Sequence, residues 1–182
     1  MPSPIAVLDT DVLVPIVACD FLLTAFDHGL YEPIVSTTSL AEIERTLTDD
    51  FPHLDRAAIR HRVATMQVAL EDQLVDGQDV DVPPGINPKD RHVVGAALVA
   101  TAQVLVSNDR RFRAEVDASE LHLASVDLDT FATGLWRSSP TEVHAVIDTM
   151  VSKRERRPIS TDELIEALHR YMPSLAAALR TS

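Results

Sequence analysis

Two aspartates lie at the end of one of the most strand-like stretches of the chain. The stretch reads IAVLDTDVLV at residues 5–14, and it places Asp9 and Asp11 among branched aliphatic residues. Aspartate is depleted in strands and is rarely buried without a partner, because desolvating a carboxylate is costly. We therefore predict that a strand ends at Leu8. The two aspartates then lie at its carboxyl end, where open parallel sheets bind ligands.

Three further acids occupy comparable turning points. Glu42 lies early in a helix predicted after the second strand, Asp90 lies in the first turn of the helix before the fourth strand, and Asp109 directly follows that strand. Taken singly, each is also explained as a solvated helix residue, a first-turn charge or a turn residue, and Glu44 could replace Glu42.

Together with Asp9, these acids are predicted to meet at one rim of a parallel sheet. Neighbouring carboxylates raise one another's pKa, and a bound cation relieves that repulsion. Oxygen ligands with no nearby His or Cys favour Mg²⁺, with Mn²⁺ as a substitute, over zinc. The pattern predicts a divalent-metal site.

The elements that must position these acids follow from hydrophobic periodicity. Helical patterns over 13–30, 37–47, 55–75 and from Asn87-Pro88 onward separate short β-branched runs. The predicted strands are Ile5–Leu8, Pro33–Ser36, Val80–Val82, Val104–Ser107 and Leu121–Ala124. Strands that alternate with helices predict an α/β fold, a doubly wound parallel sheet of about five strands with helices on both faces.

From about residue 134 the pattern becomes entirely helical. SPTE at 139–142 and STDE at 160–163 both have the form of a capping box, and Pro173 precedes a last short helix. We interpret residues 1–136 as the domain that carries the predicted metal site and 137–182 as a small C-terminal helical appendage. Its apolar positions are expected to pack onto the domain; they include Val143, Ile147, Leu164, Leu168 and Leu179.

Bulk properties narrow the class of protein. A net charge of −12 and a pI near 4.8 argue against a nonspecific nucleic-acid coat, although a metal ion can invert the field of a carboxylate cluster. Cys19 is the single cysteine, so an internal disulfide is impossible and a cytoplasmic location is expected. The first thirty residues lack a basic leader and contain aspartates, which predicts neither a signal peptide nor a membrane span.

Five segments in this order resemble a PIN-domain ribonuclease, the family that includes the VapC toxins of bacterial toxin–antitoxin pairs. The resemblance covers roughly residues 5–131; its segments are VLDTDVLV, SLAEI, PKDRHVVGAAL, VLVSNDRRF and LASVDLDTF. It implies that Asp9, Glu42, Asp90 and Asp109 are the catalytic, metal-binding acids.

The residues around these acids are expected to orient them. The family often has Asn or Ser where this chain has Asp11, which is therefore either an additional ligand or a hydrogen-bonding residue behind the ligands. Thr10, Ser107 and Asn108 are assigned the orienting role. His92 is predicted to be a polar residue on an exposed helix face.

The resemblance also implies an activity and partners. The expected reaction is Mg²⁺-dependent endoribonucleolytic hydrolysis that leaves a 3′-hydroxyl and a 5′-phosphate. Basic residues beside the acids are candidates for contacts with RNA phosphates, namely Lys89, Arg91, Arg110, Arg111 and Arg113. A cognate antitoxin protein and a homodimer are further implications of the toxin resemblance.

Two other functions are compatible with parts of the sequence. DTDVL also resembles the opening motif of haloacid-dehalogenase phosphatases, in which Asp9 would be the nucleophile and Asp11 the general acid. That family needs a lysine before a late acidic pair, for which NDRRFRAEVD is a poor substitute, and it leaves Glu42 and Asp90 unused. The second alternative is a catalytically silent RNA-binding or regulatory module, which would bind no divalent metal.

Overall fold

The computed structural model describes residues 3–155 and 157–181. Its centre is a five-stranded, all-parallel sheet in the order β3-β2-β1-β4-β5, so the predicted α/β class is confirmed. The central strand β1 pairs with β2 on one side (Ala6 opposite Pro33) and with β4 on the other (Ala6 opposite Val104). The strands are β1 (Ile5–Leu8), β2 (Glu32–Ser36), β3 (Leu74–Val75), β4 (Val104–Val106) and β5 (Ala124–Val126).

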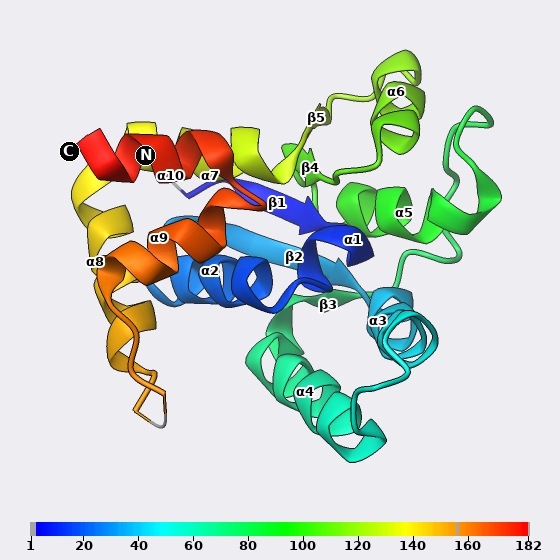
Figure 1. Cartoon of the computed structure of the whole chain (residues 1–182). Helices are drawn as coiled ribbons and strands as arrows, with labels where there is room; N and C mark the ends of the chain where they lie inside the picture. Colours follow the sequence, from blue (N-terminus) through cyan, green and yellow to red (C-terminus); the bar gives the residue numbers. More distant parts are fainter. Residues whose placement is uncertain (1–2, 156, 182) are drawn as a thin grey trace.

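Helices cover both faces of the sheet (Figure 1). Successive side chains of a strand point to opposite faces, and the strands of this sheet are apolar on both. Leu8, Val35 and Val106 belong to the core shared with α2 (Ile16–Asp27). Val7, Ile34 and Leu105 belong to a second core, beneath α5 (Arg91–Val99) and α6 (Arg110–Ala118).

The remaining elements of the first part of the chain lie between these strands. They are α1 (Thr10–Leu13), α3 (Thr37–Asp50), α4 (Arg56–Ala69) and the short 3-10 helices η1 (Glu71–Gln73) and η2 (Pro88–Asp90). The predicted helix start at Asn87-Pro88 is confirmed, since the Asn87 side chain accepts a hydrogen bond from the Lys89 backbone N–H at 3.2 Å.

The third predicted strand is wrong. Residues 80–82 form part of a loop, and β3 lies at Leu74–Val75, where Val35 faces Leu74 across the β2–β3 pair. The alternating Val-Asp-Val pattern resembles a strand, but its buried Val82 packs under α5 and its carbonyl oxygen accepts from the Arg91 guanidinium at 2.6 Å. The fifth strand begins at Ala124 and not at Leu121.

Four helices follow in the described part of the chain after residue 127: α7 (Leu128–Ser138), α8 (Pro140–Ser152), α9 (Thr161–His169) and α10 (Pro173–Thr181). The apolar positions named above in this region are buried, as predicted, and they join the same core as α2. Asp129 of α7 caps α10 by accepting the backbone N–H groups of Ser174 and Leu175. The proposed domain boundary between residues 136 and 137 falls inside α7 and stays a prediction.

One of the two predicted capping boxes is present. Ser160 and Glu163 satisfy each other's backbone N–H groups at the start of α9. Ser139 makes no side-chain cap bond; it is both the last flanking residue of α7 and the residue before Pro140, the first residue of α8. None of the helices within the described ranges is both long and apolar enough to cross a membrane.

Candidate active site

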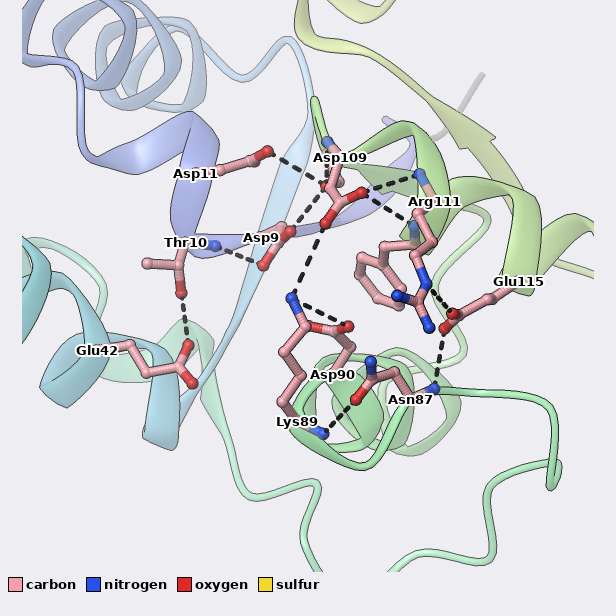
Figure 2. A network of polar contacts seen from close by, with 12 residues as sticks. Asp9, Thr10, Asp11, Glu42, Asn87, Lys89, Asp90, Asp109, Arg111 and Glu115 are labelled. Atoms are coloured by element: carbon pink, nitrogen blue, oxygen red, sulfur yellow. Dashed lines mark hydrogen bonds and ion pairs between the residues drawn. The ribbon is translucent and has the colours of Figure 1, made fainter.

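A cavity of about 400 Å³ opens beside the carboxyl ends of β1 and β4. All of the predicted acids contribute to its wall, and Glu42, not Glu44, is the glutamate of α3 that does so. Figure 2 shows the polar network that surrounds it. The lining residues are Asp9, Thr10, Asp11, Val14, Glu42, Arg45, Thr46, Lys89, Asp90 and Asp109.

Asp9 is the most tightly held of these acids. It caps α1 by accepting the Thr10 backbone N–H at 2.7 Å, and the buried Ser107 hydroxyl donates to its other oxygen at 2.7 Å. Burial raises the pKa of Asp9, and these hydrogen bonds partly offset that effect. The carboxyl group is therefore fixed in place, and a nearby cation would stabilise its ionised form.

Asp11 points back toward the end of β4. Its Oδ2 accepts the Asn108 backbone N–H at 2.8 Å and lies 3.4 Å from the Ser107 hydroxyl. Its Oδ1 is buried and has no hydrogen-bond partner among the described residues. Burial, followed by the charge of Asp9, raises the pKa of Asp11 to about 7. An unpartnered buried carboxylate oxygen is unusual and suits an added cation or water.

Glu42 is held from two sides. The Thr10 hydroxyl donates to Oε2 at 2.9 Å, and His92 Nε2 lies 3.4 Å from Oε1. The hydrogen bond from His92 is the main cause of the lowered pKa of Glu42. The expectation that His92 lies on an exposed helix face is wrong: it is buried beneath α3, because Ser36 and Glu42 offer partners to both ring nitrogens.

Asp90 and Asp109 face each other across a lysine (Figure 2). Lys89 Nζ lies 3.7 Å from Asp90 Oδ2 and 3.9 Å from Asp109 Oδ2. Asp109 also caps α6 by accepting the backbone N–H groups of Arg111 and Phe112. Burial raises the pKa of Asp90 to about 6, despite the opposing charge of Lys89.

The acids share one cavity, but they are not arranged as a ready-made metal cage. Across the described ranges, no three His, Cys, Asp or Glu side chains are close enough together to hold an ion as they stand. The donor set nevertheless fits a hard cation, because it consists of carboxylate oxygens and includes the unpartnered Asp11 Oδ1. Asp9, Asp11 and Asp90 all have raised pKa values, which a bound cation would lower.

The predicted RNA-contacting residues divide into two groups. Lys89 lines the cavity, and Arg110 and Arg111 begin α6 beside it. Arg91 instead donates to the Val82 and Pro83 carbonyls, and Arg113 pairs with Asp127 at 3.6 Å. The Arg111 guanidinium also has a partner within the chain, Glu115 at 3.1 Å, but its side chain remains exposed.

Arg45 is a cavity residue that the sequence analysis missed. It follows Glu42 by three residues on α3, a spacing that places both on one helix face, and this was the signal available. Its charge contributes to the lowered pKa of Glu42. Positively charged side chains therefore lie on both sides of the cavity, Arg45 on the α3 side and Lys89 on the opposite side.

Asn108 connects the cavity to the C-terminal helices. Its backbone N–H donates to Asp11, and its side-chain Oδ1 accepts the backbone N–H of Leu128 at 3.2 Å. Leu128 is the first residue of α7. The first residue of the C-terminal helices is thus hydrogen-bonded to Asn108, the residue that precedes Asp109.

Comparisons with known families match two successive segments of the chain. A family model described as "PIN domain" matches residues 6–111, and one described as "VapC50 C-terminal domain" matches residues 128–181. Neither the curated proteins nor the solved structures contain a significant match. The first model spans all the acids that line the cavity, and the second begins at the residue that Asn108 contacts.

Proposed function

Since this chain belongs to the PIN-domain family and carries a VapC-type C-terminal domain, it is a VapC-like nuclease, and we propose that it is a Mg²⁺-dependent endoribonuclease. The observation that carries the proposal is the single cavity that Asp9, Glu42, Asp90 and Asp109 line from separate segments of the chain. These four carboxylates would hold the metal, and Mn²⁺ would substitute for Mg²⁺. A bound divalent ion polarises a phosphodiester and lowers the pKa of water.

The chain's own residues keep this donor set oriented. Ser107 and the start of α1 fix Asp9, the N-terminus of α6 fixes Asp109, and Thr10 directs Glu42 toward the cavity. Asn108 holds one oxygen of Asp11 and leaves the other unpartnered within the described part of the chain. Asp11 would therefore orient the donor set through one oxygen, and its other oxygen would be available to the metal or to water.

RNA phosphates would approach between positively charged side chains on two sides of the cavity. Lys89, Arg110 and Arg111 lie on the α6 side, and Arg45 lies on the α3 side. Basic side chains beside a metal site contact the phosphates that flank the scissile bond. Arg91 and Arg113 are excluded from this role because the Arg91 guanidinium binds two backbone carbonyls and Arg113 is largely covered in its pair with Asp127. Arg111 also pairs within the chain, with Glu115, but its side chain stays exposed.

The VapC-type C-terminal domain supports a cognate antitoxin as the partner. The acidic cavity and the net charge of −12 favour a basic segment of that partner, and a homodimer and a cytoplasmic location are part of the same proposal. Mixing the chain with the product of the adjacent reading frame tests the pairing. Loss of RNA cleavage together with co-elution is the expected result.

Cleavage of an RNA pool in Mg²⁺, in Mn²⁺ and in EDTA tests the activity. Asp9→Asn and Glu42→Gln are expected to lower the cleavage rate at least about 100-fold. Loss of a residue that only hydrogen-bonds to a metal ligand costs up to about 100-fold, and loss of a ligand itself should cost no less. Matched controls are Asp148→Asn on α8 and Glu44→Gln on α3, neither of which lines the cavity. Cleavage by Asp9→Asn at the parental rate would refute the assignment.

The same samples separate the alternative functions. In a phosphatase, Asp9 would attack phosphorus, yet both of its oxygens accept hydrogen bonds from Thr10 and Ser107. A trapped aspartyl phosphate or rapid turnover of a small phosphate monoester would favour that alternative. Absence of divalent binding in calorimetry would leave the silent binding module.

A further inference from the structure

Two buried polar residues, Ser36 and His92, lie behind the candidate site and do not line its cavity. Ser36, at the end of β2, is fully buried, and its hydroxyl lies 2.9 Å from His92 Nδ1. His92, the second residue of α5, presents its other ring nitrogen to Glu42 of α3 at 3.4 Å. Three separate elements thus meet through one imidazole ring.

The partners of the ring determine which nitrogen carries the proton. The carboxylate of Glu42 can only accept a hydrogen bond, so Nε2 must be the N–H donor. In a neutral imidazole Nδ1 is then an acceptor, and the Ser36 hydroxyl donates to it. The arrangement therefore favours the Nε2–H tautomer of His92.

Close backbone packing fixes the position of α5, the helix that carries His92. A Cβ atom on Gly77 would lie 2.2 Å from the His92 carbonyl oxygen, and one on Gly95 would lie 2.0 Å from the Gly77 carbonyl oxygen. The loop after β3 therefore packs directly against α5, because both positions lack a side chain. Arg91 ties the first turn of α5 to the same loop.

We propose that His92, held by Ser36, is a positioning residue that keeps the Glu42 carboxylate turned into the cavity for the metal. This inference rests on the proposed function. A glutamate side chain has several rotatable bonds, and Glu42 is partly exposed, so its orientation must be imposed from outside. A residue that hydrogen-bonds to a metal-binding side chain commonly raises metal affinity, because it holds that side chain in its binding geometry.

Two substitutions at His92 separate the contact with Glu42 from packing alone. In His92→Gln the side-chain amide can reach the position of Nε2 and still donate to Glu42, whereas in His92→Asn the amide is too short to do so. Mn²⁺ affinity, measured by calorimetry on the full chain, is expected to fall about tenfold in His92→Asn and to change little in His92→Gln. His122→Gln, at an exposed position outside the cavity, is the matched control.

A long-range ¹H–¹⁵N spectrum of the imidazole nitrogens provides a second readout that needs no activity. The expected spectrum is that of the Nε2–H tautomer in the parent. Ser36→Ala, which removes no helix cap because Ser36 makes no side-chain cap bond, leaves Glu42 to fix the Nε2–H tautomer but frees Nδ1, so the ring is held less firmly and Mn²⁺ affinity should weaken. Combining His92→Asn with Glu42→Gln should weaken affinity no further than Glu42→Gln alone.

The outcomes distinguish this inference from the proposed function. Equal Mn²⁺ affinity in His92→Gln and His92→Asn, or an Nδ1–H tautomer in the parent, would overturn the role of His92. A parent that binds no Mn²⁺ would instead overturn the proposed function, and the spectrum would still decide the Ser36–His92–Glu42 contact. If His92→Asn loses its cooperative thermal unfolding, Ser36→Ala supplies the affinity comparison.

Discussion

The Lys89 ammonium lies 3.9 Å from Asp109 Oδ2, and the neighbouring Asp90 completes a bridge across the cavity. A positive charge of the chain itself thus lies between two of the acids proposed to bind metal. It lowers the pKa of Asp90, although burial has the larger, opposite effect. A bound metal ion would therefore compete with this lysine for the same carboxylates.

Replacing Lys89 with methionine should therefore strengthen divalent binding while weakening RNA binding. We expect Mn²⁺ affinity to rise about threefold to tenfold, because a nearby like charge is removed at a solvent-screened site. Calorimetry on the full chain measures this change. Lys153→Met, which removes the lysine that pairs with Asp27, is the control and should leave affinity unchanged. Weaker Mn²⁺ binding in Lys89→Met would contradict the competition.

Arg110 and Arg113 should respond differently to alanine. Arg110→Ala is expected to reduce the salt dependence of RNA affinity by about one unit of slope, as loss of one phosphate contact does. Arg113→Ala should keep the slope and lower the melting temperature, because Arg113 is largely covered and paired with Asp127. Filter binding to a fixed oligonucleotide in Ca²⁺ at several salt concentrations provides the slopes. Equal slope changes in the two variants would refute the distinction.

Two glycines in helices offer opposite stability changes. Gly95→Ala should destabilise the fold by about 2–4 kcal/mol, because the new Cβ meets the backbone of Gly77, which cannot move without shifting the loop. Gly134→Ala in α7 has nothing within 4 Å of the new Cβ and should stabilise the fold by about 0.5–1 kcal/mol. Urea unfolding monitored by circular dichroism compares them. A neutral Gly95→Ala would mean that α5 and the loop are not in close contact.

Tyr31 should make the fold sensitive to alkali. It is fully buried, its hydroxyl donates to the Leu22 carbonyl at 3.1 Å, and burial raises its pKa well above the usual value. Below about pH 10 both folded and unfolded chains keep the phenol neutral. Above that pH the unfolded chain ionises first, so the free energy of unfolding falls by up to about 1.4 kcal/mol per pH unit.

Tyr31→Phe is the test of that alkaline loss. It should cost about 1 kcal/mol at pH 7 through the missing hydrogen bond and then lose less stability than the parent between pH 10 and 11. Urea midpoints measured across this range give the comparison. Parallel curves for the two proteins would assign the alkaline loss to other groups.

The placement of the acids could be predicted because it depends on local signals. Asp9 and Asp109 each follow a strand and cap the next helix, and Asn87-Pro88 marks the start of the turn that carries Asp90. Capping preferences and the shared rim of a parallel sheet are enough to bring such residues together. The same reasoning correctly placed the Ser160 capping box.

Long-range contacts could not be read in this way. The sequence pattern predicts that Val82 lies in a strand, but its carbonyl oxygen accepts a hydrogen bond from the Arg91 guanidinium instead. The pattern likewise predicts an exposed His92, whereas Ser36 and Glu42 contact its two ring nitrogens. The position of Lys89 between Asp90 and Asp109 likewise depends on how α5 and α6 are packed. Each case depends on a side-chain partner outside the residue's own helix or strand, for which hydrophobic periodicity carries no information.

The hydrogen bond from Leu128 to Asn108 has a practical consequence for how the protein can be divided. The two family segments look separable, yet a chain shortened before residue 128 would lose the anchor beside Asp109 and uncover the apolar side of α2 that α8 packs against. If such a fragment were inactive, the cause would be loss of the fold and not the absence of catalytic residues. The smallest unit worth assaying is therefore the whole polypeptide.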